Sequence, residues 1–246
     1  MAGHSHWANI AHKKAANDKK RAKIFSKISR KILAAARRGG GDVSVNLPLK
    51  YAIQKARAAN MSNDQIKRVV DRALGVTGEG EDFEELVYEG YAPGGTAVLI
   101  EALTDNRNRT GGDLRSTFSK RGGNLGTSGS VAWQFDRKSV LRVPLDATTE
   151  DDLTMVVLEA DGDDVLVEDD AFVVQGPPEG LDALVAALGE AEVEVAQSEV
   201  TYVPRDYVAC DEDTARQVVA LLEALEENDD VQTVHTNAEF PEGFEG

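Results

Sequence analysis

Cationic and amide side chains are concentrated in the first 23 residues, together with one aromatic ring. The set comprises Trp7, Asn9, His12, Lys13, Lys14, Asn17, Lys19, Lys20, Arg21 and Lys23. Lysine and arginine bind phosphate groups, amides donate hydrogen bonds to phosphate and sugar oxygens, and an aromatic ring can stack on an unpaired base. The segment therefore predicts a nucleic-acid-binding arm. Trp7 could equally pack on a neighbouring helix, and its residue type does not separate the two roles.

A second polar cluster occupies residues 104–110, where a predicted strand gives way to a predicted helix. Asp105 or Asn108 can cap the amino terminus of that helix. Arg107 and Arg109 flank Asn108, and cations beside a helix amino terminus suit an anionic partner. Because capping does not account for both arginines, we include them among the candidate nucleic-acid contacts.

The remaining reactive side chains form no recognisable catalytic or metal-binding motif. His4 and His6 have no third ligand nearby, and the acidic residues 161–164 lack the spacing of a calcium loop. The glycine-rich segment 122–130 contains no Gly-Lys-Ser/Thr and follows a helix, which indicates a turn rather than a phosphate loop. Cys210 has no thiol partner. We therefore predict a protein that is not an enzyme and that uses no metal, cofactor or small-molecule substrate.

Charge is distributed very unevenly along the 246 residues. Residues 1–80 contain seventeen Lys and Arg against five Asp and Glu, whereas residues 143–246 contain two against twenty-nine. The overall charge of −16 therefore conceals a basic amino-terminal region. Nucleic-acid binding depends on local charge, so this region favours a polyanionic partner. A merely solvated surface is the alternative, but solvated helices normally mix both signs, and residues 1–38 hold eleven bases and one acid.

The composition, with 41% hydrophobic residues, is that of an ordinary globular protein. No apolar run approaches the roughly 20 residues of a membrane helix, and the basic amino terminus lacks the apolar core of a secretory signal. The single cysteine excludes an internal disulfide. These observations predict a cytoplasmic protein that makes no membrane contact.

The first predicted helix is amphipathic from Ile24 to the glycines at 39–41. Its apolar face carries Ile24, Phe25, Ile28, Ile32 and Ala35, and the opposite face carries Lys20, Lys23, Lys27, Arg30, Lys31 and Arg38. Upstream, Lys14 and Arg21 project into the apolar sector. Residues 1–21 are therefore expected to remain outside the helix unless a partner orders them.

Two further helices complete a predicted three-helix bundle with a cationic surface. One begins near Pro48, and the other follows a capping box formed by Ser62 and Gln65 and ends at Gly75. The third helix places Lys67, Arg68 and Arg72 outside. Near its start, Asn63, Asp64, Gln65 and Arg68 could read bases in a groove, although this set is not distinctive.

The rest of the chain alternates strands and helices. Strands are expected at 85–91, 96–103 and 131–135, with a helix at 109–121. A complete βαββαβ order follows, with strands at 140–143, 165–167, 171–174 and 193–203 and helices at 149–160 and 179–188, which is the ferredoxin-like motif. A last helix (211–227) and strand (231–235) need a sheet to join, and the first group of strands can supply it.

The predicted fold is α+β and multidomain. Residues 1–78 form a basic arm and a three-helix bundle. Residues 79–137 and 207–246 form a central α/β domain, into which an acidic ferredoxin-like domain is inserted as residues 138–206. The oligomeric state cannot be read from these patterns.

Several long motifs resemble the YebC/PmpR family. They are the opening residues 1–10, Lys-Ile-Phe-Ser-Lys at 23–27, Ala-Asn-Met-Ser-Asn-Asp at 59–64, and the segments 88–95, 104–110 and 122–126. The resemblance runs through essentially the whole chain. It departs at His6 and Ala11, where the family usually has lysine, and at Gly111 and Gly112.

The resemblance implies the same three domains and no enzymatic activity or cofactor. It also implies a probable transcriptional regulator that binds DNA, and some family members, including mitochondrial ones, act on translation at the ribosome. A long basic arm with little sequence readout suits ribosomal RNA, and a groove-reading helix suits DNA. A protein-interaction scaffold that uses the acidic half is the third possibility. That acidic half could promote solubility, repel nucleic acid so that only the basic end binds, or shield the arm.

Overall fold

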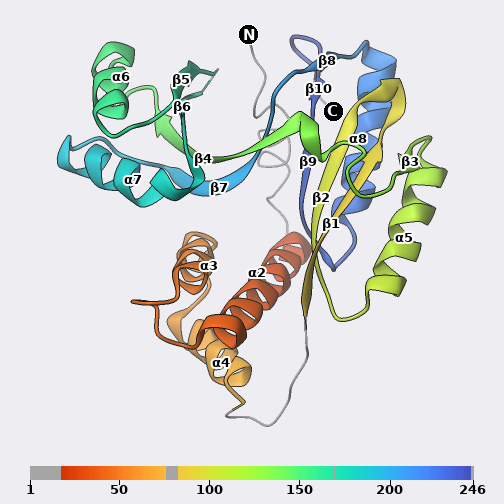
Figure 1. The fold of residues 1–246 in the computed structure, drawn as a ribbon, viewed down its shortest axis with the longest axis horizontal. Coiled ribbons are helices and arrows are strands. Elements are labelled where there is room, and N and C mark those ends of the chain that lie inside the picture. The colour runs from red at the N-terminus through yellow and green to blue at the C-terminus, as the bar shows by residue number, and fades with distance from the viewer. Residues whose placement is uncertain (1–17, 76–82, 169, 245–246) are drawn as a thin grey trace. The chain divides into compact units, whose positions relative to one another are not determined.

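The structure of the protein is a computed structural model that describes residues 18–75, 83–168 and 170–244, with side chains from Ala22 onward (Figure 1). The chain has the predicted α+β class, with helices at its amino-terminal end followed by two four-stranded sheets. Several predicted arm residues lie outside the described part of the chain, namely Trp7, Asn9, His12, Lys13, Lys14 and Asn17. The side chains of Lys19, Lys20 and Arg21 lie outside it as well.

Three helices form the amino-terminal bundle: α2 (Asp18–Gly39), α3 (Leu47–Ala58) and α4 (Asn63–Ala73). Their common core includes Ile28, Ile32, Leu33, Leu49, Met61 and Ile66. The capping box predicted for α4 is confirmed. The Ser62 hydroxyl accepts a hydrogen bond from the Gln65 backbone N–H, and the Gln65 side-chain oxygen accepts one from the Ser62 N–H.

The first helix begins earlier than its apolar stripe predicts. α2 starts at Asp18, and Ile24, expected on the buried face, is 37% exposed. The residues of α2 that pack in the bundle core begin only at Phe25 and Ile28. Lysine, arginine and alanine are good helix formers, and each added residue gains a backbone hydrogen bond without needing a buried side chain. The helix can therefore extend beyond its own core.

The central sheet has the strand order β3-β1-β2-β9. β1 (Glu84–Tyr91) and β2 (Ala97–Thr104) form an antiparallel hairpin around the short 3-10 turn η1 (Pro93–Gly95), β3 (Asn124–Leu125) extends one edge, and β9 (Val231–Thr236) pairs antiparallel with β2. The strand that follows α8 thus joins the sheet of the first strands. A separate parallel pair is formed by β8 (Val208–Ala209) and β10 (Ala238–Glu239).

Two helices, α5 (Arg107–Lys120) and α8 (Glu212–Glu226), cover the same face of this sheet. Leu114 and Phe118 of α5 and Leu222 of α8 share one hydrophobic core with Val98 and Ile100 of β2. The contact is close at Gly90, where an added Cβ would lie 2.7 Å from the Phe118 ring. Only glycine fits at that point of β1, and the close approach fixes α5 against the sheet.

Residues 133–206 form the second sheet, whose order is β5-β6-β4-β7 with all neighbours antiparallel. Its elements are β4 (Phe135–Pro144), α6 (Glu150–Glu159), β5 (Asp164–Val167), β6 (Ala171–Gly176), the 3-10 turn η3 (Pro178–Gly180), α7 (Leu181–Glu190) and β7 (Gln197–Pro204). The βαββαβ order and the central position of the first and third strands are those of a ferredoxin-like fold. Thr149 caps α6, because its side-chain oxygen accepts a hydrogen bond from the Asp152 backbone N–H.

The prediction of a strand at residues 131–135 is wrong. Residues Ala132–Gln134 form a 3-10 turn, η2, and the chain enters β4 only at Phe135. The Glu89 carboxylate accepts hydrogen bonds from the backbone N–H groups of Gly129, Val131 and Ala132 at 2.7–2.8 Å. The N–H groups of Val131 and Ala132 therefore donate to a side chain, whereas in a strand they would donate to the backbone of a neighbouring strand.

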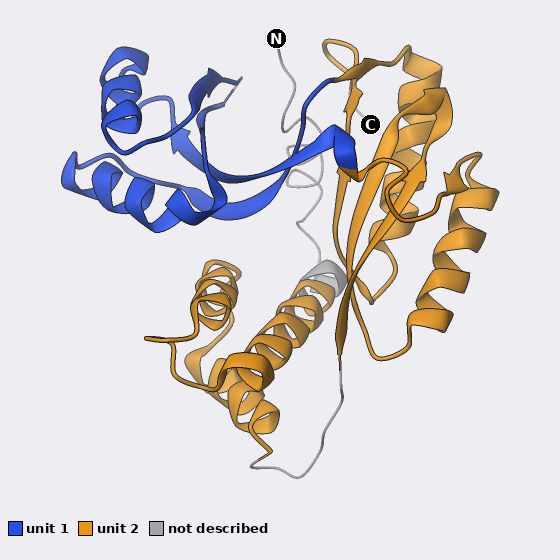
Figure 2. Ribbon diagram, in the orientation of Figure 1, with its two compact units in different colours: residues 1–4, 133–206 blue, residues 5–132, 207–246 orange. Residues whose placement is uncertain are grey.

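The chain divides into two compact units, residues 133–206 and the remainder of the described chain (Figure 2). The bundle and the central sheet belong to the same unit. The boundaries expected at 78, 138 and 206 stay predictions about how the chain is divided into domains.

Candidate nucleic-acid interface

The cations on the outer face of α2 contact an acidic segment of the same chain. This segment, residues 226–230, joins α8 to β9 and reads Glu-Glu-Asn-Asp-Asp. Lys23 donates to the backbone oxygen of Glu227 and lies 3.1 Å from its carboxylate, and Lys27 donates to the backbone oxygen of Glu226 at 3.0 Å. The two lysines thus bind carbonyls at the carboxyl end of α8, which the helix itself leaves unpaired.

Arg30 completes the contact between α2 and the acidic segment. One of its guanidinium nitrogens donates to the backbone oxygen of Asp229 and to Asp230 Oδ1, each at 2.7 Å, and its guanidinium lies over the Phe83 ring. The sequence interpretation placed Lys23, Lys27 and Arg30 on a solvent-facing cationic surface. The structure corrects this for these three residues, because their side chains bind residues 226–230.

Burial changes the acidity of Lys27. Desolvation lowers its pKa from the ordinary value to about 8, and nearby Glu226 only partly opposes the shift. The ammonium group is thus still mostly charged at neutral pH, but it is held in an environment that disfavours its charge. Such a lysine is poorly placed to meet a phosphate in solvent.

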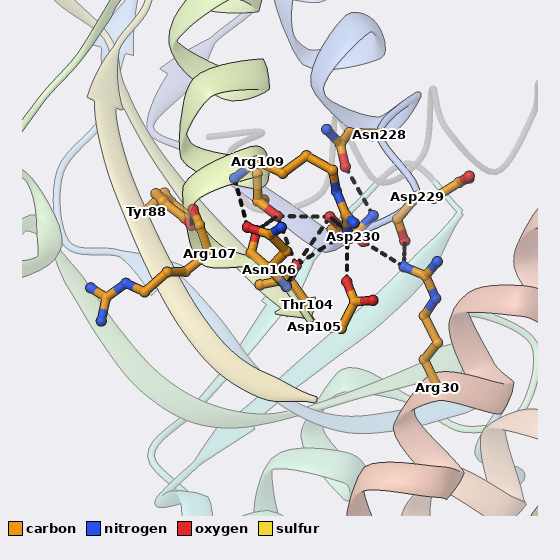
Figure 3. A network of polar contacts seen from close by, with 11 residues as sticks. Arg30, Tyr88, Thr104, Asp105, Asn106, Arg107, Arg109, Asn228, Asp229 and Asp230 are labelled. Carbon is orange, nitrogen blue, oxygen red and sulfur yellow. Dashed lines mark hydrogen bonds and ion pairs between the residues drawn. The ribbon is translucent and has the colours of Figure 1, made fainter. Parts of the chain in front are cut away.

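Asp230 is the centre of the network in Figure 3 and is only 4% exposed. Its Oδ1 accepts from Arg30, and its Oδ2 accepts from Arg109 at 2.8 Å and from the Thr110 hydroxyl at 2.7 Å. Burial alone would raise the pKa of this carboxyl, but the hydrogen bonds from Arg109, Thr110 and Arg30 outweigh it and hold the pKa below its ordinary value. Asp230 therefore joins α2 and α5 through ionised contacts.

The start of α5 explains one of the two arginines that flank Asn108. The capping residue is Asn106, whose side chain accepts from the Arg109 N–H at 3.1 Å, so the expectation of Asp105 or Asn108 as the cap is wrong. The Thr104 hydroxyl oxygen accepts a hydrogen bond from the Asn106 backbone N–H at 2.9 Å. This contact holds the turn in which Asn106, the residue after Asp105, becomes the cap. Arg109 pairs with both Asp105 and Asp230, which raises the pKa of its guanidinium. Its role here is structural.

Arg107 differs from Arg109 because its side chain remains in solvent. The side chain is 67% exposed and its guanidinium lies 4.0 Å from the Glu84 carboxylate, and the backbone oxygen of Arg107 accepts a hydrogen bond from the Tyr88 hydroxyl. The two arginines that the sequence groups together therefore have different surroundings, and only Arg107 is placed to meet an external anion.

Exposed cations of the bundle lie on α3 and α4, and α2 adds Arg38, which is exposed and pairs with Glu85 at 3.0 Å. Arg57 at the end of α3 and Lys67 and Arg68 on α4 are all exposed, whereas Lys31 and Arg72 are half-buried. Arg72 was expected outside; its Nε is buried. Within the described residues, no carboxylate forms a salt bridge with Arg57, Lys67 or Arg68. Arg57 is a candidate that the sequence reasoning missed, although its place in the basic region was a usable signal.

The set of side chains able to read bases is smaller than the sequence suggests. The side-chain oxygen of Gln65 is held by Ser62, and Arg68 Nε donates to the Asp64 backbone oxygen at 3.2 Å. Asn63 and Lys67 remain exposed near the start of α4. The sequence already predicted that Gln65 forms a capping box with Ser62, and that role competes with the reading of bases by the same side chain. The geometry favours contacts to a phosphate backbone over base readout.

The glycine-rich segment 122–130 does not offer free amides to a phosphate. Glu89, which is buried, takes the N–H groups of Gly129, Val131 and Ala132. Burial would raise the pKa of Glu89, but these hydrogen bonds hold it below the ordinary value. A carboxylate of the chain itself thus occupies the place that an anionic ligand would need.

The described residues contain no group of three or more His, Cys, Asp and Glu arranged to hold a metal ion. Cys210 is half-buried, and burial raises the pKa of its thiol, which disfavours the nucleophilic thiolate. Among the same described residues, no helix is both long enough and apolar enough to cross a membrane.

Two family models match consecutive parts of the chain. The TACO1/YebC protein N-terminal domain matches residues 5–76, and the TACO1/YebC second and third domain matches residues 83–238. The chain belongs to the TACO1/YebC family. The resemblance noted in the sequence motifs is thereby confirmed, and it covers both compact units.

Relatives in this family are similar over nearly their full length. A probable transcriptional regulatory protein of Rubrobacter xylanophilus is 49% identical over 98% of this chain and 97% of its own, and one of Treponema denticola is 46% identical over 100% and 99%. The crystal structure of a conserved hypothetical protein from Aquifex aeolicus has the same fold, with a TM-score of 0.85 and 44% identity over 97% of this chain and 98% of that one.

Proposed function

We propose that the protein is a nucleic-acid-binding regulator of gene expression that acts on DNA as a transcriptional regulator. The observation that carries this proposal is that three exposed cations of the bundle, Arg57, Lys67 and Arg68, form no salt bridge among the described residues, in a chain whose amino-terminal sequence is also basic. Its relatives named probable transcriptional regulatory proteins support the same role. The proposal involves no catalytic step and no cofactor.

Binding would depend mainly on the phosphate backbone. Among the exposed side chains of α3 and α4, four are cationic and Asp64 alone is acidic, and Asn63 and Lys67 near the start of α4 would be within reach of bases. Phosphate contacts give affinity with strong salt dependence and little sequence discrimination. The predicted arm contacts, which include Lys13, Lys14, Lys19, Lys20 and Arg21, would add to the same electrostatic term.

Salt dependence tests the proposal directly. The triple variant Arg57→Ala/Lys67→Ala/Arg68→Ala should lower the slope of log affinity against log salt by roughly 2–3 for duplex DNA, because each lost phosphate contact contributes about 0.9. Fluorescence anisotropy with a labelled 24-base-pair duplex at several KCl concentrations measures this slope. Arg216→Ala on α8 is the control, since that arginine is exposed and paired with Glu212. An unchanged slope in the triple variant would show that the bundle is not the contact surface.

A second candidate function is a ribosome-associated translation factor that contacts ribosomal RNA. The observation that favours it is the small number of base-reading side chains on α4, since recognition of a folded RNA depends mainly on shape and backbone. Crosslinking the protein in cells and sequencing the bound nucleic acid separates the two. Recovery of promoter DNA contradicts the translation role, and recovery of ribosomal RNA contradicts the transcription role.

A further inference from the structure

The central sheet domain carries all but one of its cations on or directly after a single helix. Residues 83–132 contain five Lys and Arg, and all of them lie on α5 or directly after it: Arg107, Arg109, Arg115, Lys120 and Arg121. α8, which covers the same sheet face, is acidic and has Arg216 as its only cation. The helical layer of this sheet is therefore divided into a basic and an acidic helix.

Three of the α5 cations are unused by the fold. Arg115, Lys120 and Arg121 are exposed, and among the residues that the structure describes none forms a salt bridge with them. Asp113 is the only acid on the helix. This arrangement differs from Arg109, which is held by Asp105 and Asp230.

Stabilisation of the helix dipole does not account for the whole set. Lys120 and Arg121 lie at the carboxyl end of α5, where cations are favourable. Arg115 lies in the middle of the helix, more than a turn before that end, where the dipole effect has faded. Basic residues occur in the last turns of α2, α3 and α4 but not of α6, α7 and α8, so the cations at the end of α5 have precedent in the chain and Arg115 is the one that the dipole leaves unexplained.

The side chains between these cations are small and polar. Asn108, Ser116 and Ser119 are exposed on the same side of α5 as Gly112, and a Cβ added at Gly112 would meet nothing within 4 Å. Arginine, lysine, serine and asparagine are the side chains that commonly contact phosphate and sugar oxygens. None of the exposed α5 side chains is large and apolar, so an apolar protein partner has no anchor on this helix.

We propose that the exposed face of α5, defined by Arg115, Lys120 and Arg121, is a second contact surface for the phosphate backbone of duplex DNA. This inference rests on the proposed function and adds a site outside the bundle and the arm. Charge complementarity selects the partner, because this face is the one basic surface that the described residues of the sheet domain present. The surface contributes affinity and orientation, not sequence discrimination.

The test uses the full-length protein and the same labelled duplex. Arg115→Ala/Lys120→Ala/Arg121→Ala should lower the salt slope by roughly 2–3 and weaken binding on the order of 100-fold at 0.15 M salt. Gly112→Glu should weaken binding as well, whereas Gly112→Gln, which has the same shape without the charge, should not. Both Gly112 variants enter open space on a helix surface, and both raise helix propensity, so folding is preserved.

The outcomes separate this inference from the proposed function. If the Arg57/Lys67/Arg68 variant loses salt dependence and the α5 variants bind like the unmodified protein, the second surface is refuted and the proposed function stands. If the α5 triple variant binds duplex DNA normally but loses binding to ribosomal RNA, the assignment to duplex DNA is wrong. If the unmodified protein shows no salt-dependent binding to the duplex, both proposals fall.

Discussion

The two cation-rich helices α2 and α5 contain the same residue types but use them differently. On α2, Lys23, Lys27 and Arg30 are bound to the acidic segment 226–230, about 200 positions later in the chain. On α5, Arg115 and Lys120 point to solvent, and no carboxylate among the described residues pairs with them. The type and spacing of cations therefore do not decide whether a basic helix can receive an external polyanion. The deciding factor is whether another segment of the folded chain already pairs with those cations.

Acidic residues have correspondingly different roles in the two regions. Near α2, the carbonyls and carboxylates of 226–230 take positions that phosphate oxygens could otherwise fill. Asp230 also binds Arg109 of α5, so one buried carboxylate joins both basic helices. The acidic charge of the carboxyl-terminal region thus includes residues that hold the bundle against the sheet, in addition to those that only promote solubility.

The largest expected effect is the loss of Asp230. Asp230→Ala should lower the free energy of unfolding by about 3 kcal/mol, because it leaves the guanidinium groups of Arg30 and Arg109 and the Thr110 hydroxyl without their shared acceptor. Urea denaturation measures the change, and hydrogen exchange should show faster exchange in both α2 and β9. Asp229→Ala is a matched control, since Asp229 is exposed and bonds Arg30 through its backbone oxygen. If both variants lower the free energy of unfolding equally, the Asp230 carboxylate is not what connects α2 to α5.

A smaller effect is expected from the titration of Lys27. Its folded pKa of about 8 lies below the ordinary value, so the unfolded chain binds this proton more tightly and stability should rise with pH between about 8 and 10.5. The rise should be about 2–3 kcal/mol, since one pKa unit corresponds to about 1.4 kcal/mol. Lys27→Met should remove this rise and stabilise the protein at pH 7. If the variant keeps the same dependence of stability on pH, Lys27 is not desolvated. The cations of α2 would then be exposed to solvent like those of α5.

Local signals in the sequence were sufficient for much of the fold. The side chains of Ser62 and Gln65 lie within three residues of the groups they bind, and the capping box that they form was predicted correctly. The ferredoxin-like order followed from periodicity and turn residues in one continuous stretch. By contrast, residues 104–110 offered several side chains able to cap, and the Thr104 hydroxyl selected Asn106 through a contact that no spacing rule reveals.

The candidate site was harder to predict because its key contacts are distant in sequence. Lys27 and Glu226 are separated by 199 positions, and no local pattern distinguishes a lysine that meets a backbone oxygen from one that meets solvent. The turn at Val131 was missed for a similar reason, since its N–H binds Glu89, 42 positions earlier. Charge patterning correctly identified basic helices, but only the packing of the α8–β9 connection shows which cations remain exposed.

The smallest expected effect concerns the exposed edge of the α2 contact. The side chain of Glu227 is 79% exposed, and Lys23 also binds the Glu227 backbone oxygen, so Glu227→Gln should change the free energy of unfolding by no more than about 0.5 kcal/mol. Glu212→Gln removes a comparable exposed pair with Arg216 on α8 and should have an equally small effect. Urea denaturation of both variants at low salt provides the comparison. A loss above about 2 kcal/mol for Glu227→Gln alone would mean that the carboxylate of Glu227, and not the buried Asp230, holds α2 in place.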